Sequence, residues 1–328
     1  MKIAVIGSGG WGTALSLVLV KNGHEVVLWS HSSAQNERLR TERTNPRLPG
    51  VSLPAELGFS DDLSCVSGAE LAVIAVPSFA VRETAAKLEP LLSGNTMLIS
   101  AAKGIEKGTY LRMSEIIRQE TGRETAVISG PSHAEEVAVE QPTGCVVADG
   151  NGKRAELLQD VFMNDRLRIY TSADVTGVEL CGALKNIVAL CAGICDGLGL
   201  GDNSKALLMT RGIAEIARLG TRFGASQETF MGLAGIGDLI VTCTSMHSRN
   251  RRAGILIGKG STAKQAMDEV GAVVEGYYAA MAAYEMGRSA GVSMPITASA
   301  YRILYENSDP NTEIGMLMRR QKKNESIL

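Results

Sequence analysis

A glycine-rich turn near the start of the chain constrains the fold more than any other feature. The apolar run Ile3-Ala4-Val5-Ile6 leads directly into Gly7-Ser8-Gly9-Gly10-Trp11-Gly12, and an apolar helical pattern follows over residues 14–20. Here Gly7 permits a tight turn, Gly9 lets a pyrophosphate approach the backbone, and Gly12 lets the helix pack on the strand. The free N–H groups at the start of that helix attract phosphate. The position between a strand and a helix favours a dinucleotide-binding unit over a purely structural glycine turn.

Length and composition favour two domains with large apolar cores. The chain has 328 residues, 45% of them hydrophobic, and a formal net charge of −2. This charge, without a long basic run, argues against a nucleic-acid partner. The six cysteines show neither disulfide nor zinc-finger spacing, which indicates reduced thiols and a cytoplasmic protein. We expect no membrane span, because no segment approaches about 20 apolar residues, and the N-terminal apolar run is too short for a signal peptide.

The order of predicted elements divides the chain in two. Strands alternate with helices up to about residue 172, which predicts a parallel sheet covered on both faces. Beyond that point the pattern is almost wholly helical. Within the first part, the Pro/Gly-rich segment 46–54 is predicted to be a loop. We therefore expect an α/β chain, with an N-terminal Rossmann-type doubly wound sheet over 1–175 and an all-helical C-terminal substrate and catalytic domain over 176–328. The predicted strands after the first are 24–30, 71–76, 96–100, 126–129, 144–148 and 167–170. The predicted helices include 80–92, 109–121, 154–163, 173–196, 203–223, 249–258, 262–269, 276–290, 296–306 and 310–319.

The end of the second predicted strand bears on the choice of cofactor. A strictly NAD-binding site usually has a carboxylate there, which holds the ribose 2′-hydroxyl. This chain has Ser30-His31-Ser32 instead. His31, or the nearby Arg38 and Arg40, would attract a 2′-phosphate, which favours NADP or dual use of NADP and NAD, with NADPH preferred. The alternative is that His31 only packs or caps.

Polar residues that suit catalysis gather in four places. Lys103-Gly104 and Gly130-Pro131-Ser132 each follow a predicted strand, where ligands bind in doubly wound folds. Lys185-Asn186 lies within an otherwise apolar predicted helix. Asp238 and the run Ser248-Arg249-Asn250 come later. These groups are the candidates for chemistry.

Lys185 is the strongest of them. A lysine in so apolar a helix is costly unless it is paired or reaches water. Burial would lower its pKa and suit it to general acid–base work, whereas a nearby Asp238 would raise that pKa. Asp238 either orients the lysine or caps the next helix. Arg249 and Asn250 suit a phosphate. The alternative for Lys185 is a partly exposed helix lysine without a catalytic role, and the alternative for Arg249 is an ordinary surface arginine.

Taken together, these motifs resemble the bacterial soluble NAD(P)-dependent glycerol-3-phosphate dehydrogenases. The matching stretches cover almost the whole chain: GSGGWGTALS (7–16), VVLWSH (26–31), AVPS (75–78), KGIE (103–106), SGPSHAEEVA (129–138), GALKN (182–186), RGIAE (211–215), GLAGIGDLIVTC (232–243), SRNRRAG (248–254) and VVEG (273–276). The family interconverts dihydroxyacetone phosphate and sn-glycerol 3-phosphate, which feeds glycerophospholipid synthesis. The resemblance implies NADP or NAD as cofactor, a small phosphorylated three-carbon substrate and a homodimer. It implies no metal, since the lysine supplies the positive charge.

The resemblance also implies roles for individual residues. Lys185 would donate and accept the proton at C2, with Asp238 beside it. The implied substrate contacts are Lys103, Gly130, Ser132, Lys185, Asn186, Asp238, Ser248, Arg249 and Asn250. The implied cofactor contacts are Gly7, Gly9, Gly10, Trp11, Gly12, His31, Lys103, Ala134, Arg249, Val273 and Glu275. Two positions depart from the family: Gly10 stands where Ser is frequent, and His133 stands where a bulky aromatic residue is common.

Two other functions compete with this one. A β-hydroxyacid or 6-phosphogluconate-type dehydrogenase also places a lysine on a long helix, but GLAGIGDL (232–239) and SRNRRAG (248–254) argue against it. A non-catalytic NAD(P)-binding sensor is compatible with the fold alone. The presence together of a lysine, an aspartate and phosphate-binding residue types opposes that reading.

Overall fold

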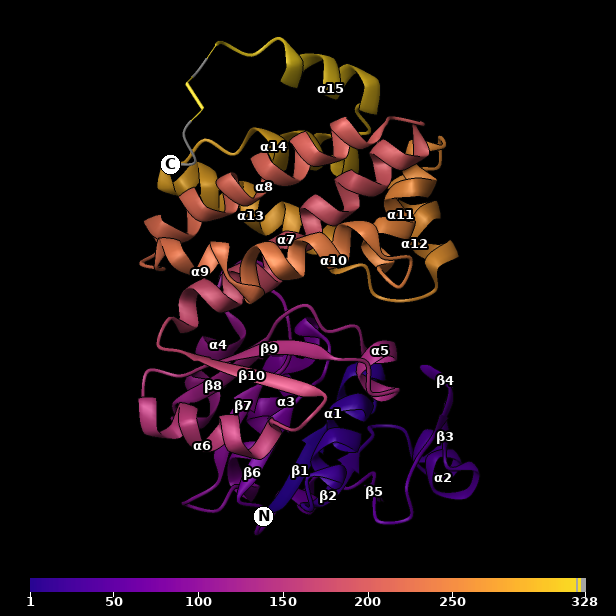
Figure 1. The fold of residues 1–328 in the computed structure, drawn as a ribbon, viewed down its shortest axis with the longest axis vertical. Coiled ribbons are helices and arrows are strands. Elements are labelled where there is room, and N and C mark those ends of the chain that lie inside the picture. Colours follow the sequence, from indigo (N-terminus) through magenta and orange to yellow (C-terminus); the bar gives the residue numbers. More distant parts are fainter. Residues whose placement is uncertain (323, 326–328) are drawn as a thin grey trace. The chain divides into compact units, whose positions relative to one another are not determined.

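The computed structural model describes residues 1–322, 324 and 325, and its contacts divide the chain into two compact units (Figure 1). Unit 1 comprises Met1–Lys103 and Leu111–Val175, and unit 2 comprises Gly104–Tyr110 and the chain from Thr176 onward. The short segment 104–110 thus packs with unit 2 although its neighbours on both sides belong to unit 1. Residues 323 and 326–328 of the predicted second domain lie outside the described residues.

Unit 1 is built on an eight-stranded sheet in the order β10-β9-β8-β7-β6-β1-β2-β5. Its strands are β1 (Lys2–Ile6), β2 (Glu25–Trp29), β5 (Gly58–Ser60), β6 (Leu71–Ile74), β7 (Met97–Ser100), β8 (Thr125–Ser129), β9 (Thr143–Ala148) and β10 (Leu167–Ser172). All neighbouring pairs are parallel except β8 and β9, which run antiparallel. The expected wholly parallel sheet is therefore wrong at this one pair. The connection between β8 and β9 contains only a five-residue helix, whereas parallel neighbours are usually joined by a longer helical crossover.

Helices cover both faces of this sheet, as the Rossmann-type pattern predicted. Helices α1 (Gly10–Lys21), α5 (Ala134–Ala138) and α6 (Gly152–Phe162) pack on one face, and α3 (Val81–Leu88) and α4 (Met113–Thr121) on the other. Within β1, Ile3 and Val5 belong to the first core, and Ala4 and Ile6 to the second. Because successive strand residues point to opposite faces, a sheet covered on both sides needs an uninterrupted apolar run.

The remaining elements of unit 1 are short. Helix α2 (Ser33–Glu42) follows β2, and 3₁₀ turns lie at η1 (Leu63–Val66), η2 (Ser78–Ala80) and η3 (Glu89–Leu91). The segment expected to be a loop instead contains an antiparallel pair, β3 (Thr44–Asn45) and β4 (Leu48–Ser52). Proline at exposed positions of so small a sheet interrupts few ladder hydrogen bonds, so the prolines did not prevent the pairing.

The extended regular elements of unit 2 are all helices within its described residues, and the segment 104–110 forms turns with one bridge residue, Ile105. The helices of unit 2 are α7 (Val175–Gly197), α8 (Asp202–Arg222), α9 (Gln227–Met231), α10 (Asp238–Thr244), α11 (Arg249–Gly258), α12 (Ala263–Val270), α13 (Glu275–Ala290), α14 (Pro295–Tyr305) and α15 (Pro310–Met318). A π-helical turn, η4 (Leu233–Gly237), precedes α10. The sequence pattern did not reveal α9, η4 and α10, because short helices with several glycines show little periodicity.

Helix α7 forms the core of unit 2. It is long and apolar enough to cross a membrane by length and composition, so the expectation that no segment approaches this limit was wrong. In the structure 94% of its most apolar 18-residue window is buried inside the protein. The apolar length of α7 is thus used for packing against the surrounding helices.

Candidate active site

In unit 1, the glycine turn lies where the strand order reverses. Strand β1 has β2 on one side and β6 on the other, and dinucleotides bind at such a switch point. Gly7 has φ +124°, and a Cβ there would lie 2.7 Å from the carbonyl oxygen of Ala75. A Cβ on Gly12 would lie 1.9 Å from the carbonyl oxygen of Gly7. Both positions therefore require glycine for the turn and the close helix–strand approach.

The start of α1 is open on the side that a pyrophosphate would use. Gly9 is the exposed N-cap residue of α1, and a Cβ built on it would meet nothing within 4 Å. No side chain caps this helix end, so its first N–H groups have no side-chain acceptor. The indole Nε1 of Trp11 is buried and has no hydrogen-bond partner among the described residues. A free donor beside an open helix N-terminus fits a phosphate-bearing cofactor.

The end of β2 carries no carboxylate. The N–H of buried Ser30 donates to the Ser60 carbonyl (2.9 Å), Ser32 caps α2, and His31 is exposed. Arg38 pairs with Glu42 on the same helix (2.9 Å), and Arg40 donates to the Phe59 carbonyl (3.3 Å). Of the three basic side chains considered for a 2′-phosphate, His31 is therefore the least engaged in other contacts.

Three predicted substrate residues meet at the carboxyl end of β8. The ammonium of half-buried Lys103 donates to the carbonyl of Gly130 (3.1 Å), and the hydroxyl of Ser132 donates to the same oxygen (3.0 Å). Gly130 has φ +152°, and a Cβ there would lie 2.9 Å from Cα of Cys145, so glycine is required. Ala134, at the start of α5, lies against Gly10, since a Cβ on Gly10 would be 3.5 Å from that of Ala134.

In unit 2, a buried lysine is held by two acceptors. Lys185 on α7 is 6% exposed, and its ammonium donates to Asp238 Oδ1 and to the Thr242 hydroxyl (2.6 Å). The hydroxyl of Thr242 donates in turn to the Asp238 carbonyl (2.6 Å). The charge of Lys185 is thus compensated by a carboxylate, as a buried ammonium requires. The arrangement holds one proton-bearing Nζ in a defined place.

The turn η4 accounts for the placement of Asp238. A Cβ on Gly235 would lie 2.2 Å from the Phe230 carbonyl oxygen, so this tight π-helical turn needs glycine. Asp238 is the first residue of α10, and Thr242 lies four residues further on the same helix face. Sequence reasoning missed Thr242, although the i, i+4 spacing from a candidate aspartate was visible. Isolated π-helical turns of this kind are frequent at functional sites.

A network of side-chain amides joins three helices beside this lysine. Asn250 donates to the Oδ1 of Asn186 (2.8 Å) and accepts from the N–H of Gly276 (2.8 Å), and Asn186 donates to the Gly182 carbonyl (3.3 Å). The starts of α11 and α13 are thereby tied to α7. Buried amides that are bonded in this way fix backbone position.

The N-terminus of α11 is suited to an anion. Ser248 is its N-cap residue and accepts from the N–H of Arg251 (3.2 Å). The exposed Arg249 is the first residue of this ten-residue helix, which has no acidic residue in its first turn. The positive end of the helix dipole and the Arg249 guanidinium both attract a phosphate there. Val273 and Glu275 lie at the start of α13, next to the Gly276 that bonds Asn250.

Two further features of the described residues bear on the chemistry. They contain no group of three or more His, Cys, Asp or Glu side chains that could hold a metal ion. Burial raises the pKa of the Cys243 thiol, next to Thr242, to about 12. A thiol with so high a pKa stays protonated at neutral pH, so it is a poor nucleophile.

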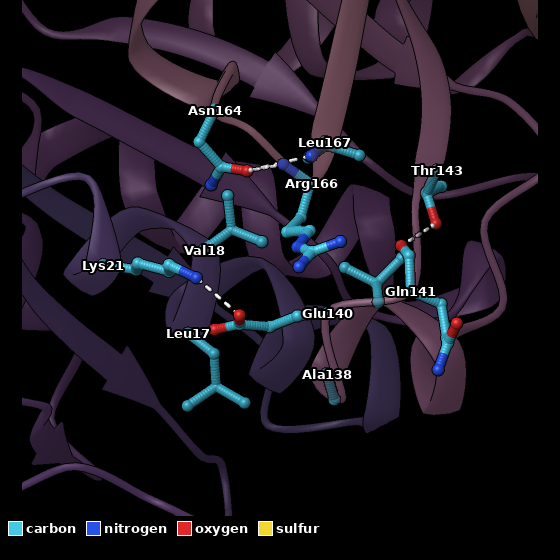
Figure 2. Close-up of a pocket in the computed structure, with 11 residues that line it drawn as sticks. Leu17, Val18, Lys21, Ala138, Glu140, Gln141, Thr143, Asn164, Arg166 and Leu167 are labelled. Atoms are coloured by element: carbon cyan, nitrogen blue, oxygen red, sulfur yellow. Dashed lines mark hydrogen bonds and ion pairs between the residues drawn. The ribbon is translucent and has the colours of Figure 1, made fainter.

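A small pocket in unit 1 lies apart from these residues. Figure 2 shows it around the ion pair of Lys21 Nζ with Glu140 Oε2 (2.5 Å). Its volume is about 30 Å³, which is room for a few water molecules. None of the predicted site residues lines it. It is therefore too small and in the wrong place for a dinucleotide or its substrate.

A doubly wound sheet with an open glycine turn, and a helical unit that carries a buried lysine–aspartate pair, together define a nicotinamide-dinucleotide-dependent dehydrogenase. Comparison with known proteins gives the particular family. The model of the NAD-dependent glycerol-3-phosphate dehydrogenase N-terminus matches residues 2–155, and that of the C-terminus matches residues 174–315. The chain belongs to this family, an NAD(P)-dependent oxidoreductase family, as its motifs predicted.

Individual relatives agree along nearly the whole chain. The glycerol-3-phosphate dehydrogenase [NAD(P)+] of Thermoanaerobacter sp. is 50% identical over 99% of this chain and 99% of its own. That of Clostridium acetobutylicum is 51% identical over 98% of both chains. The crystal structure of the enzyme from Coxiella burnetii has a TM-score of 0.93 at 41% identity, covering 97% of this chain and 99% of that one.

Proposed function

We propose that this chain interconverts dihydroxyacetone phosphate and sn-glycerol 3-phosphate by hydride transfer with NADPH or NADH. The observation that carries the proposal is the buried Lys185, bonded to Asp238 and Thr242 in a member of this family. Protonated lysine in a dry, apolar helix is suited to stabilise a developing alkoxide. The same group, once neutral, accepts the proton in the reverse direction.

The proton balance assigns one role to each side chain. When bound, the nicotinamide supplies or removes the hydride at C2. The ammonium of Lys185 holds the proton at Nζ and delivers it to the oxygen on C2, so that the ketone becomes an alcohol. Asp238 and Thr242 hold the lysine in place and compensate its charge. In the reverse reaction the neutral Nζ takes the hydroxyl proton.

Arg249 and the N-terminus of α11 are proposed to bind the substrate phosphate. The Arg249 guanidinium and the N–H groups in the first turn of α11 are donors of the kind that phosphate accepts, and they lie beside an Asn250 amide that also donates to Asn186. Binding energy at the phosphate, remote from the reacting carbon, orients C2 without taking part in the chemistry. Lys103, Gly130 and Ser132 are proposed to contact substrate from unit 1.

NADPH is proposed as the preferred cofactor. No carboxylate stands at the end of β2 to repel a 2′-phosphate, and exposed His31 and the Ser32-capped N-terminus of α2 favour one. The glycine turn with Trp11, Ala134, Val273 and Glu275 would complete the contacts, as the family resemblance implies. We further propose a cytoplasmic homodimer whose product enters glycerophospholipid synthesis, which rests on family membership and on six free cysteines.

The first experiment measures oxidation of NADPH, and separately of NADH, with dihydroxyacetone phosphate and with unphosphorylated dihydroxyacetone. We expect rapid turnover with the phosphorylated ketone alone, and a higher kcat/KM with NADPH. Turnover of β-hydroxyacids instead would favour the related dehydrogenase class. Tight NADPH binding without turnover of any substrate would favour the sensor.

Arg249→Ala tests the phosphate site. Loss of a charged hydrogen-bond donor should raise the KM for dihydroxyacetone phosphate roughly 10- to 100-fold. Arg252→Ala, on the same helix and also exposed, is the matched control and should leave KM unchanged. An equal KM in both variants would place the phosphate elsewhere. Sedimentation of the purified protein would test the dimer.

A further inference from the structure

Residues Gly104–Tyr110, which we call the strap, leave unit 1 and return to it while packing on unit 2. Lys103 precedes the strap and Leu111 follows it, and both belong to unit 1. Ile105 of the strap is 7% exposed. The strap is therefore held on unit 2 at its buried start, Gly104 and Ile105, whereas Lys107, Gly108 and Thr109 are exposed.

A hydrogen bond ties the end of the strap to α13. The hydroxyl of Tyr110 donates to the carboxylate of Glu285, with 2.6 Å between the oxygens. A backbone hydrogen bond within the strap also holds Tyr110, since its N–H donates to the Glu106 carbonyl (3.0 Å). A neutral donor on a carboxylate makes a stronger bond than two neutral partners do.

The backbone of Tyr110 is strained. Its φ of +59° lies in the left-handed region, which residues other than glycine, Asn and Asp rarely adopt. Such conformations persist where surrounding contacts impose them, and they cluster at functional sites. The neighbouring Gly108, at φ +87°, meets the same demand without strain. The strained backbone of Tyr110 thus occurs at the residue whose side chain bonds to Glu285.

A cavity lies between the strap and the helices α13 and α14. Its volume is about 150 Å³. Its lining residues are Ile105, Lys107 and Tyr110 from the strap, Tyr277, Tyr278, Met281, Ala282 and Glu285 from α13, and Tyr305 from α14. Close packing is absent at this cavity, so polar contacts at its rim matter more for holding the strap in place.

The strap is joined directly to a predicted site residue. Lys103 lies one peptide bond before Gly104, which keeps their Cα atoms about 3.8 Å apart. The ammonium of Lys103 donates to the Gly130 carbonyl at the carboxyl end of β8. The strap and Lys103 are therefore continuous along the chain, and a displacement of the strap is a route by which the backbone of Lys103 can move.

We propose that Tyr110 and Glu285 are positioning residues for the dehydrogenase reaction. Their hydrogen bond latches the strap onto α13 and so holds Lys103 where substrate and cofactor need it. This inference rests on the proposed function, in which Lys103 contacts both. Neither Tyr110 nor Glu285 touches the reacting atoms.

Tyr110→Phe removes the donor and keeps the ring. We expect kcat/KM for dihydroxyacetone phosphate to fall about 10-fold, the factor by which loss of a hydrogen bond to a charged group shifts a two-state equilibrium. Amide hydrogen exchange over residues 104–109 should quicken, while exchange in α14 stays the same. Tyr278→Phe, in the same cavity and half exposed, is the matched control and should change neither. Glu285→Gln keeps an acceptor oxygen and should retain most activity, whereas Glu285→Ala should behave like Tyr110→Phe.

A double-mutant cycle with Lys103→Ala separates positioning from mere stability. If the latch acts through Lys103, Tyr110→Phe should have no further effect on kcat/KM in the Lys103→Ala background, assayed at raised enzyme concentration. An equal loss in both backgrounds would overturn the proposal, as would unchanged turnover or unchanged strap exchange in Tyr110→Phe. Wild-type protein that does not reduce dihydroxyacetone phosphate would overturn the proposed function itself. Normal wild-type turnover with an insensitive Tyr110→Phe variant would overturn the latch alone.

Discussion

At the scale of single residues, the proposed chemistry depends on a charge that the protein buries and compensates. A buried ammonium without a partner would cost several kcal/mol, and Asp238 offsets this cost for Lys185. The Thr242 hydroxyl donates a hydrogen bond to the Asp238 carbonyl, so its oxygen lone pairs accept from Lys185. The ammonium of Lys185 therefore has its position fixed as well as its charge compensated. The sequence left open whether Asp238 orients the lysine or caps the next helix, and it did not indicate Thr242.

Lys185→Ala should lower kcat by about 10²–10⁴-fold, the usual contribution of a positioned general acid. NADPH affinity, measured by fluorescence titration, should remain nearly unchanged, because the cofactor contacts assigned to the glycine turn are intact. The variant leaves Asp238 without its partner, which costs roughly 3–5 kcal/mol of stability. Lys185→Met combined with Asp238→Asn serves as the stability control. Normal turnover in Lys185→Ala would remove this lysine from the mechanism.

At the scale of elements, glycine pairs set the distance between the helix that carries Lys185 and the one that begins with Arg249. A Cβ on Gly193 of α7 would lie 2.0 Å from the Arg251 carbonyl oxygen. A Cβ on Gly254 of α11 would lie 2.0 Å from the Leu190 carbonyl oxygen. The two helices thus touch backbone to backbone. This crossing explains why glycines that weaken a helix locally occur inside α7 and α11.

Gly254→Ala should therefore destabilise the protein by about 1–3 kcal/mol or more, the cost of overpacking a tight contact. Urea unfolding, read as a change in midpoint at constant slope, measures it. Gly152→Ala is the matched helical control, since a Cβ there meets nothing within 4 Å. Equal midpoints for the two variants would show that α7 and α11 are not in contact at these glycines.

A buried carboxylate links α8 to α14 and makes stability depend on pH. Glu215 accepts hydrogen bonds from the N–H groups of Ile296 (2.6 Å) and Thr297 (3.1 Å) at the start of α14. Burial raises the pKa of Glu215 from 4.5 to about 7, against the opposing effect of those two donors and of Arg218. The folded state then holds a proton that the unfolded state has released. Stability from this group is full below pH 4.5 and is lost as the pH rises to about 7.

Glu215→Gln should remove this dependence, because the amide keeps an acceptor oxygen and does not titrate. Between pH 4.5 and 7 the wild-type free energy of unfolding should fall relative to the variant by up to about 3 kcal/mol. Paired thermal unfolding curves across this range measure the difference. Parallel pH profiles for the two proteins would show that Glu215 does not change its protonation on unfolding.

At the scale of the whole molecule, cofactor binding and folding are linked. A ligand that binds only the folded protein stabilises it by about 2.7 kcal/mol at a concentration 100 times its Kd. NADPH should therefore raise the melting temperature. Gly9 is the position that separates binding from folding, because a Cβ there meets nothing in the protein yet occupies the space proposed for the pyrophosphate.

Gly9→Ala should accordingly melt like the wild type without cofactor, and should lose most of the rise that NADPH causes. Differential scanning fluorimetry with and without NADPH measures both quantities. Gly7→Ala, at φ +124°, should instead destabilise the protein even without cofactor, since alanine strains that backbone. An undiminished NADPH shift in Gly9→Ala would move the pyrophosphate away from the glycine turn.

What the sequence determined by itself is local and periodic. The strand–turn–helix at residues 2–21, the covered sheet, the change to helices near residue 172 and a lysine in an apolar helix all follow from patterns within short windows. The motifs also identified the family correctly. Such features are readable because propensity and alternation act over a few residues.

Only the tertiary structure decided which distant groups meet. Thr242 as a partner of Lys185, the antiparallel β8–β9 pair and the strap that belongs to unit 2 all join residues far apart along the chain. The helix predicted from residue 109 begins only at Met113, since the backbone of Tyr110 is left-handed and Arg112 is the extended N-cap residue. Local preference is worth tenths of a kcal/mol to about 1 kcal/mol per residue, and burial and hydrogen bonding across the fold exceed it where the two disagree.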